Sequence, residues 1–157
     1  METLAPNSTY CHSIIRMNTH QPTEFIDLSS RLAALVAEAD IRVGVINVQS
    51  LHTTTAIVVN EHEPLLLADF AALLANAARA DTSYRHDDMS TRTVNVAPGE
   101  RANGHAHCRA LLLGSSVSIN VAGGQLQLGR WQRIFLVELD GPRNREVSVL
   151  VFGQGVR

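Results

Sequence analysis

The chain has 157 residues, 45% hydrophobic and 18% charged, which is typical of one globular domain and excludes a disordered chain. Its formal net charge of −2 excludes the basic character of most nucleic-acid-binding domains, so we expect no nucleic-acid partner. All 13 basic residues are arginines, which excludes lysine Schiff-base chemistry and leaves arginine as the cation for phosphate or carboxylate groups.

The cellular setting follows from the cysteines and the apolar stretches. Cys11 and Cys108 are too few for a disulfide framework. No apolar stretch reaches the roughly 20 residues of a membrane span, and the first residues lack the charged start and apolar core of a signal peptide. We therefore expect a cytoplasmic protein with no membrane partner.

The first half of the chain predicts alternating strands and helices after a flexible tail at residues 1–9. A single domain should then occupy residues 10–157. We expect strands at 10–19, 42–49 and 53–59, and helices at 31–39 and 65–79. Ser29 and Ser30 offer an N-cap to the first helix, and Glu63-Pro64 marks the start of the second. The second helix is apolar nearly all round, which indicates burial or a subunit contact.

The second half begins with residues 82–104, where no clear element is expected; loops of this length tend to be functional or disordered. A short helix at 106–113 should end at Gly114 in a left-handed cap. Four strands should complete the chain as a β meander, at 117–121, 125–128, 134–138 and 146–152. Gly123-Gly124 is a two-residue turn signal between the first two of them. The fold class is therefore α+β, with a mainly antiparallel β-sheet packed with helices in a single compact domain.

The histidines are the most informative feature for function. The string Asn103-Gly104-His105-Ala106-His107 places two imidazoles two residues apart, and His52 and His86 also lie in polar, turn-flanked settings. Imidazole is the commonest metal ligand and titrates nearest neutral pH, so such a set indicates a metal site or an acid/base pocket. Hydrogen-bonded surface histidines are the alternative for each.

The geometry of each candidate depends on local structure. As an extended pair His105 and His107 would point the same way, which suits one metal ion. At the first turn of a helix they would stay neutral, and the same helix end would attract phosphate. His52 and Asn60 share a face if the strand between them is regular, with Glu61 just past its end.

Two further candidates could contact a ligand. Trp131 could form the wall for a flat substrate ring, or pack in the core. Ser115 could donate a hydrogen bond to an anion, or belong to a capping turn. The sequence motifs of serine hydrolases, P-loop nucleotide hydrolases and dinucleotide-binding domains are absent.

Several strings taken together resemble one known family. They are His52-Thr53-Thr54-Thr55-Ala56-Ile57 running to Asn60-Glu61, Tyr84-Arg85-His86-Asp87-Asp88, Asn103-Gly104-His105-Ala106-His107, Leu112-Leu113-Gly114-Ser115-Ser116, Gly129-Arg130-Trp131-Gln132-Arg133-Ile134-Phe135 and Glu138-Leu139-Asp140-Gly141-Pro142-Arg143. In this order they resemble the YjbQ family of small proteins, which carries the label "secondary thiamine-phosphate synthase". The resemblance covers nearly the whole chain after about Tyr10.

The resemblance implies an α+β fold assembled as a homotrimer, with sites near the subunit contacts. It also implies a pocket lined by His52, His86 and His107, with Glu61 nearby; His105 matches many but not all members. One departure is Asn120, where the family strand often carries proline. The family label implies joining a pyrimidine diphosphate to a thiazole phosphate with release of pyrophosphate.

Three functional hypotheses follow. The first is an enzyme acting on a small phosphorylated compound, with Glu61 as the acid/base and His52, His86 and His107 as ligands of a divalent metal. Histidine ligands favour zinc, and diphosphate chemistry favours magnesium. In this hypothesis Asn60, His105, Ser115 and Trp131 contact the substrate. The second is a non-catalytic trimer that binds a metal or an anionic metabolite, and the third is a structural or chaperone-like assembly.

Overall fold

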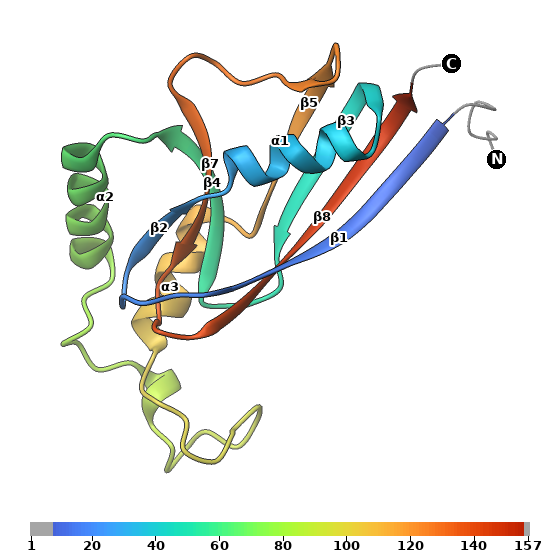
Figure 1. The fold of residues 1–157 in the computed structure, drawn as a ribbon. Helices are drawn as coiled ribbons and strands as arrows, with labels where there is room; N and C mark the ends of the chain where they lie inside the picture. Colours follow the sequence, from blue (N-terminus) through green and yellow to red (C-terminus); the bar gives the residue numbers. More distant parts are fainter. Residues whose placement is uncertain (1–7, 156–157) are drawn as a thin grey trace.

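Two antiparallel sheets and three α-helices make up the computed structural model, which describes residues 8–155 (Figure 1). Sheet A contains, in spatial order, β1 (Ser8–Asn18), β8 (Asn144–Gly155), β3 (Ile41–Ser50), β5 (Ser116–Ala122) and β6 (Gln125–Leu126). Sheet B contains β2 (Glu24–Asp27), β7 (Gln132–Glu138) and β4 (Thr55–Glu61). The helices are α1 (Ser29–Glu38), α2 (Pro64–Ala77) and α3 (Gly104–Leu113), with a 3₁₀ turn η1 (Arg85–Asp87). This arrangement confirms the predicted α+β class, and every strand pair is antiparallel.

Strand β7 lies between two hydrophobic cores. Ile134 and Leu136 belong to the core shared by sheet A, α1 and one face of sheet B. Phe135 and Val137 belong to the core on the other face, under α2 and α3. Because neighbouring side chains of a strand point to opposite faces, a continuous apolar run is what a strand with two covered faces requires.

The predicted C-terminal β meander is wrong. β5 and β6 form a hairpin, and its turn glycines, Gly123 and Gly124, have positive φ angles of 61° and 78°, as predicted. β7 then joins sheet B, and β8 returns to sheet A between β1 and β3. The physical reason is burial: β7 needs cover on both faces, whereas β8 alternates buried and exposed residues along one covered face. Strand β2 was not predicted.

The predicted start of α2 at Glu63 is confirmed, whereas the predicted N-cap of α1 at Ser29 is not. Glu63 caps α2 by accepting hydrogen bonds from the amides of Leu65 (3.0 Å) and Leu66 (2.8 Å). The expected serine cap of α1 is wrong, because the Ser29 hydroxyl accepts the Ile134 amide (2.9 Å) and the N-cap position is Leu28. A tertiary hydrogen bond to β7 has replaced the local one.

The end of α3 also departs from its prediction. Gly114 has the positive φ expected of a cap residue, 89°, but its ψ of 160° is extended. Almost only glycine adopts this combination of φ and ψ, which lies outside the left-handed helical conformation. The chain thereby leaves α3 in the direction of β5, and the Gly114 carbonyl accepts the Ile57 amide of β4 (3.2 Å).

Helix α2 packs one side against the core under sheet B and exposes the other side within this chain, so the expectation of burial is confirmed only in part. Leu74 is its one buried residue, while Leu65 and Leu73 are 76% and 65% exposed. A subunit contact on this helix stays a prediction. None of the helices within residues 8–155 is long and apolar enough to cross a membrane.

Two predicted loop regions have different outcomes. The expected tail at residues 1–9 falls largely outside the described residues, and β1 already begins at Ser8. The expected segment without regular structure, 82–104, is confirmed apart from η1 and the first residue of α3. In Figure 1 this segment extends away from the sheets below α3.

Candidate functional site

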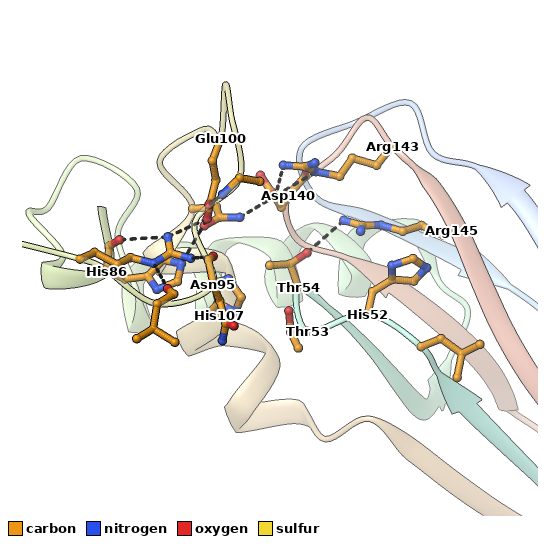
Figure 2. A pocket seen from close by; sticks show the side chains of 15 residues that line it. His52, Thr53, Thr54, His86, Asn95, Glu100, His107, Asp140, Arg143 and Arg145 are labelled. Atoms are coloured by element: carbon orange, nitrogen blue, oxygen red, sulfur yellow. Dashed lines mark hydrogen bonds and ion pairs between the residues drawn. The ribbon is translucent and has the colours of Figure 1, made fainter. Parts of the chain in front are cut away.

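A cavity of about 630 Å³ lies at the end of the molecule where the segment after α2 meets the turns before β4 and β8. Its lining is mostly polar and comprises Leu51, His52, Thr53, Thr54, His86, Arg92, Val94, Asn95, Ala97, Glu100, Asn103, His107, Asp140, Arg143 and Arg145. Figure 2 shows two sides, with His86, Asn95, Glu100 and His107 on one and His52, Arg143 and Arg145 on the other. Thr53, Thr54 and Asp140 lie between them.

The fold brings together three of the predicted histidines from three separate elements. His52 lies in the turn between β3 and β4, His86 in η1 and His107 in the first turns of α3. The three histidines meet because the turn before β4 lies beside the N-terminal end of α3. Residues 82–103 then fold back between that turn and α3.

His86 and His107 form a contacting pair. Their ring centroids are 4.5 Å apart with planes inclined at 62°. The Nε2 atom of His86 is buried and has no hydrogen-bond partner among residues 8–155, and its distance of 3.8 Å to Oε1 of Glu100 is too long for a hydrogen bond. A buried polar atom without a partner is unusual, and here it lies at the cavity wall.

His107 is neutral at pH 7. Burial lowers the pKa of the His107 imidazole, and the neighbouring His86 lowers it further, because a charge on either ring disfavours a charge on the other. A neutral imidazole keeps a free lone pair, so His107 can accept a proton or coordinate a metal.

His52 is held by a backbone hydrogen bond. Its Nε2 accepts the Glu146 amide of β8 at 2.8 Å, so the ring proton of the neutral form is on Nδ1. Burial, and then the nearby positive charge of Arg145, lower the pKa of His52. Neutral His52 therefore offers an N–H donor, and its lone pair is already engaged.

Each arginine of the cavity has a carboxylate partner. Arg92 Nη1 donates to Glu100 (2.7 Å), Arg143 Nη2 lies 2.8 Å from Asp140, and Arg145 donates to Glu138 at 2.6 Å through both Nε and Nη2. The ion pairs fix the guanidinium groups in place.

The Glu138–Arg145 pair is buried and links the two sheets. Glu138 of β7 is 0% exposed and Arg145 of β8 is 4% exposed. The carboxylate also accepts the Thr19 hydroxyl of the β1–β2 connection (2.9 Å) and two backbone amides, while Arg145 donates to the Thr54 hydroxyl (3.1 Å). Burial alone would raise the pKa of Glu138, but the hydrogen bonds from Arg145 and the backbone amides outweigh it and hold the pKa below its ordinary value.

The N-terminal end of α3 is occupied by a side chain of the protein. Oδ1 of Asp87 accepts the amides of Asn103 and Gly104, both at 2.9 Å. The carboxylate fills the position at which the sequence suggested that a phosphate could bind. A side chain at Gly104 would collide with Tyr84, 2.5 Å from an added Cβ, so this close approach requires glycine.

The other predicted site residues lie outside the cavity of this chain. His105 is on α3 beside Tyr84, with burial lowering its pKa. Glu61 is at the far end of β4, roughly 20 Å from Thr55 at about 3.3 Å per residue. Asn60 lines a separate apolar cavity under α2. Ser115 is exposed before β5, and Trp131 is 59% exposed beneath the guanidinium of Arg130.

The donor set of one chain does not fit a metal centre. No group of three His, Cys, Asp or Glu side chains within residues 8–155 is arranged to hold a metal ion. The lone pair of His52 is engaged, and Glu100 is already bound to Arg92, which leaves His86 and His107. A catalytic zinc requires three protein ligands, so this pair would need a further ligand from outside these residues.

Sequence reasoning did not select the charged residues of the cavity, Arg92, Glu100, Asp140, Arg143 and Arg145, as site residues. One signal was available, since Glu138 and Asp140 follow directly on the apolar run of β7. Charged residues at the end of a fully buried strand must be paired, and here the partners face a cavity.

Comparison with known proteins decides the family. The family model described as "UPF0047 protein YjbQ-like" matches residues 13–154. The chain belongs to the UPF0047 family. A UPF0047 protein of Methanothermobacter thermautotrophicus is 38% identical over 138 residues, which cover 88% of this chain and 89% of the relative. The UPF0047 protein YugU of Bacillus subtilis is 29% identical over 146 residues, covering 88% and 97%.

Solved structures of UPF0047 relatives share this fold. A Sulfolobus solfataricus protein described as "YbjQ-like" and "of unknown function" aligns with a TM-score of 0.84 and 31% identity, covering 94% of this chain and 99% of that one. A Clostridium acetobutylicum protein of the yjbq/upf0047 family aligns with a TM-score of 0.78 and 31% identity, covering 88% and 98%. In this UPF0047 chain, the strings at Tyr84–Asp88, Asn103–His107 and Glu138–Arg143 all reach the cavity region.

Proposed function

We propose that the cavity binds a small phosphorylated compound and performs acid/base chemistry on it with His107 and His86. The observation that carries the proposal is the contacting pair of imidazoles, one neutral and one with an unpartnered buried nitrogen, facing fixed arginines across one cavity. A general base needs a free lone pair, and burial lowers the pKa of His107, so the neutral ring keeps its lone pair at pH 7.

The arginine side supplies the binding part of the proposal. Arg143 and Arg145 are fixed by Asp140 and Glu138 and so present their remaining donors in a set orientation. A planar guanidinium fork suits phosphate recognition. His52 adds an N–H donor on the same side of the cavity.

The experiment measures binding and turnover separately. Binding of inorganic phosphate and a panel of phosphomonoesters is measured by calorimetry on the wild type, His107→Ala and Trp131→Ala, the last being a control outside the cavity. Conversion of each compound, and the coupling of a pyrimidine diphosphate to a thiazole phosphate implied by the YjbQ resemblance, are followed by ³¹P NMR. We expect turnover of one compound that His107→Ala abolishes and Trp131→Ala preserves.

The second candidate function is binding without turnover. It is favoured by the ion pairing of every cavity arginine, because a rigid, charge-balanced cavity is sufficient for a binding protein. Saturable binding with no product from any compound would support this candidate and refute the catalytic one. No binding of any phosphorylated compound would refute both.

Assembly and metal content complete the proposal. We propose a homotrimer whose contacts include the exposed leucines of α2. The test compares the sedimentation of the wild type with that of the double variant Leu65→Glu/Leu73→Glu. As the alternative to their acid/base role, His86 and His107 would hold a zinc ion whose missing ligand comes from a neighbouring copy, such as Glu61 of that copy. Metal analysis of the wild type and His107→Ala tests this: stoichiometric zinc lost in the variant would support it.

A further inference from the structure

The two sides of the cavity differ in which hydrogen-bonding groups are still available. We call His52, Arg143 and Arg145 the donor side, and His86, Glu100 and His107 the acceptor side (Figure 2). This difference specifies the ligand more closely than the proposed function does. The inference drawn from it rests on that proposed function.

The donor side keeps unused N–H groups. Arg143 and Arg145 bond their carboxylates through Nε and Nη2, and no hydrogen bond to another described residue involves Nη1 of either. His52 contributes Nδ1–H. The anionic partner of Arg145, Glu138, is fully buried behind it, whereas that of Arg143, Asp140, itself lines the cavity.

The guanidinium beside the acceptor side, that of Arg92, has its donors already engaged. The Arg92 guanidinium donates through Nε to the Val94 carbonyl, through Nη1 to the His86 carbonyl and Glu100, and through Nη2 to the Asn95 carbonyl. What this side offers a ligand is the carboxylate of Glu100 and the ring nitrogens of His86 and His107. The Glu100 carboxylate accepts hydrogen bonds from Arg92 (2.7 Å) and from the Ala97 amide (3.1 Å).

We propose that the ligand is a phosphomonoester that carries a hydrogen-bond donor, best an ammonium group, at its opposite end. The phosphoryl group lies at the donor side, where Arg143, Arg145 and His52 donate hydrogen bonds to its oxygens. The ammonium lies at the acceptor side, near Glu100 and His107. A second anionic group at that end would face a carboxylate without an available guanidinium, which is unfavourable.

The test uses three phosphomonoesters of nearly equal size. They are 3-aminopropyl phosphate, butyl phosphate, which replaces the ammonium by a methyl group, and 3-phosphooxypropanoate, which replaces the terminal aminomethyl group by a carboxylate, so that carboxylate oxygens stand at the position of the ammonium. Calorimetry at pH 7 should give a Kd for the amine that is about tenfold or more below that of butyl phosphate, since a charge-assisted hydrogen bond is gained. The carboxylate should bind more weakly than butyl phosphate.

The variant Glu100→Gln separates charge from shape. It keeps an oxygen acceptor for Arg92 and removes the negative charge, so the preference for the amine should fall to within about twofold. Asp81→Asn removes a surface carboxylate that pairs with Arg79 outside the cavity lining, and it should leave the preference unchanged.

The outcomes distinguish this inference from the proposed function. Equal Kd values for the three compounds on the wild type, or tightest binding of butyl phosphate, would overturn the inference and leave the phosphate-binding cavity standing. Absence of binding for all three would overturn both. The comparison on the wild type decides the matter even if Glu100→Gln fails to fold.

Discussion

At the scale of single residues, the proposed chemistry depends on imidazoles that stay neutral at pH 7. Burial lowers the pKa of both His52 and His107, although the two rings differ in their partners. His52 is fixed by the Glu146 amide and serves as a donor, whereas His107 contacts His86 and keeps its lone pair. Two residues of one type therefore have different capabilities, because their hydrogen bonds differ.

The pH dependence of activity follows from His107. If the neutral ring is the base, the rate is constant near pH 7 and falls on the acid side, with a midpoint below the ordinary histidine pKa of 6.5 because the pKa is lowered. Rates measured from pH 4.5 to 8 with the compound that turns over test this. In Trp131→Ala, the control outside the cavity, the midpoint should not move. A midpoint above 6.5 would contradict the assignment of His107.

At the scale of elements, the segment between α2 and α3 is held by polar contacts in place of apolar packing. Its valines, Val94 and Val96, are exposed, and Arg92 bonds to acceptors on His86, Val94, Asn95 and Glu100. This one guanidinium therefore fixes both the cavity wall and the backbone of His86. A lysine could not replace it, since a single ammonium cannot reproduce the fork of donors.

Replacement of Arg92 should affect the cavity far more than the fold. In Arg92→Ala we expect phosphomonoester binding to weaken about tenfold or more and amide exchange to accelerate over residues 86–100. The unfolding temperature should change little, since the segment adds few buried apolar groups. Arg79→Ala is the matched control, because Arg79 pairs with Asp81 at 2.6 Å on the surface. Unchanged binding in Arg92→Ala would show that the wall is held by other contacts.

At the scale of the whole molecule, the Glu138–Arg145 pair connects the sheets behind the cavity. β7 of sheet B supplies the carboxylate, β8 of sheet A supplies the guanidinium, and Thr19 and Thr54 complete the network. Removal of one partner leaves a buried charge uncompensated, which costs far more than the loss of a surface pair.

The stability of the protein should therefore depend on Glu138 and on acid pH. Glu138→Gln should lower the free energy of unfolding in urea at pH 7 by about 3–5 kcal/mol. Glu146→Gln, in a surface pair with Arg16, should lower it by about 1 kcal/mol or less. Because the pKa of Glu138 is lowered in the folded state, its contribution is complete above the ordinary glutamate pKa of 4.5 and is lost as the pH falls through the folded-state pKa. A loss below 1 kcal/mol for Glu138→Gln would contradict this role.

Local patterns in the sequence determined the elements whose signals are local. Glu63-Pro64 starts α2 because the cap and its amides lie within three residues, and Gly123-Gly124 closes the β5–β6 hairpin because positive φ angles suit glycine. The histidine candidates of the cavity were also recognisable, since imidazoles in polar turns are rarely needed for a core.

Only the tertiary structure decided which strands pair with one another and which charged side chains become partners. The assignment of β7 to sheet B depends on the cover that α2 and α3 give its second face, which no pattern within the strand specifies. The arginines of the cavity and their carboxylate partners are only 3 to 8 positions apart, but the network around Glu138 and Arg145 also joins Thr54 to Arg145 across 91 positions. Which charged residues become partners is fixed by the packing of the two sheets, because an ion pair depends on proximity in space and leaves no periodic trace in the sequence.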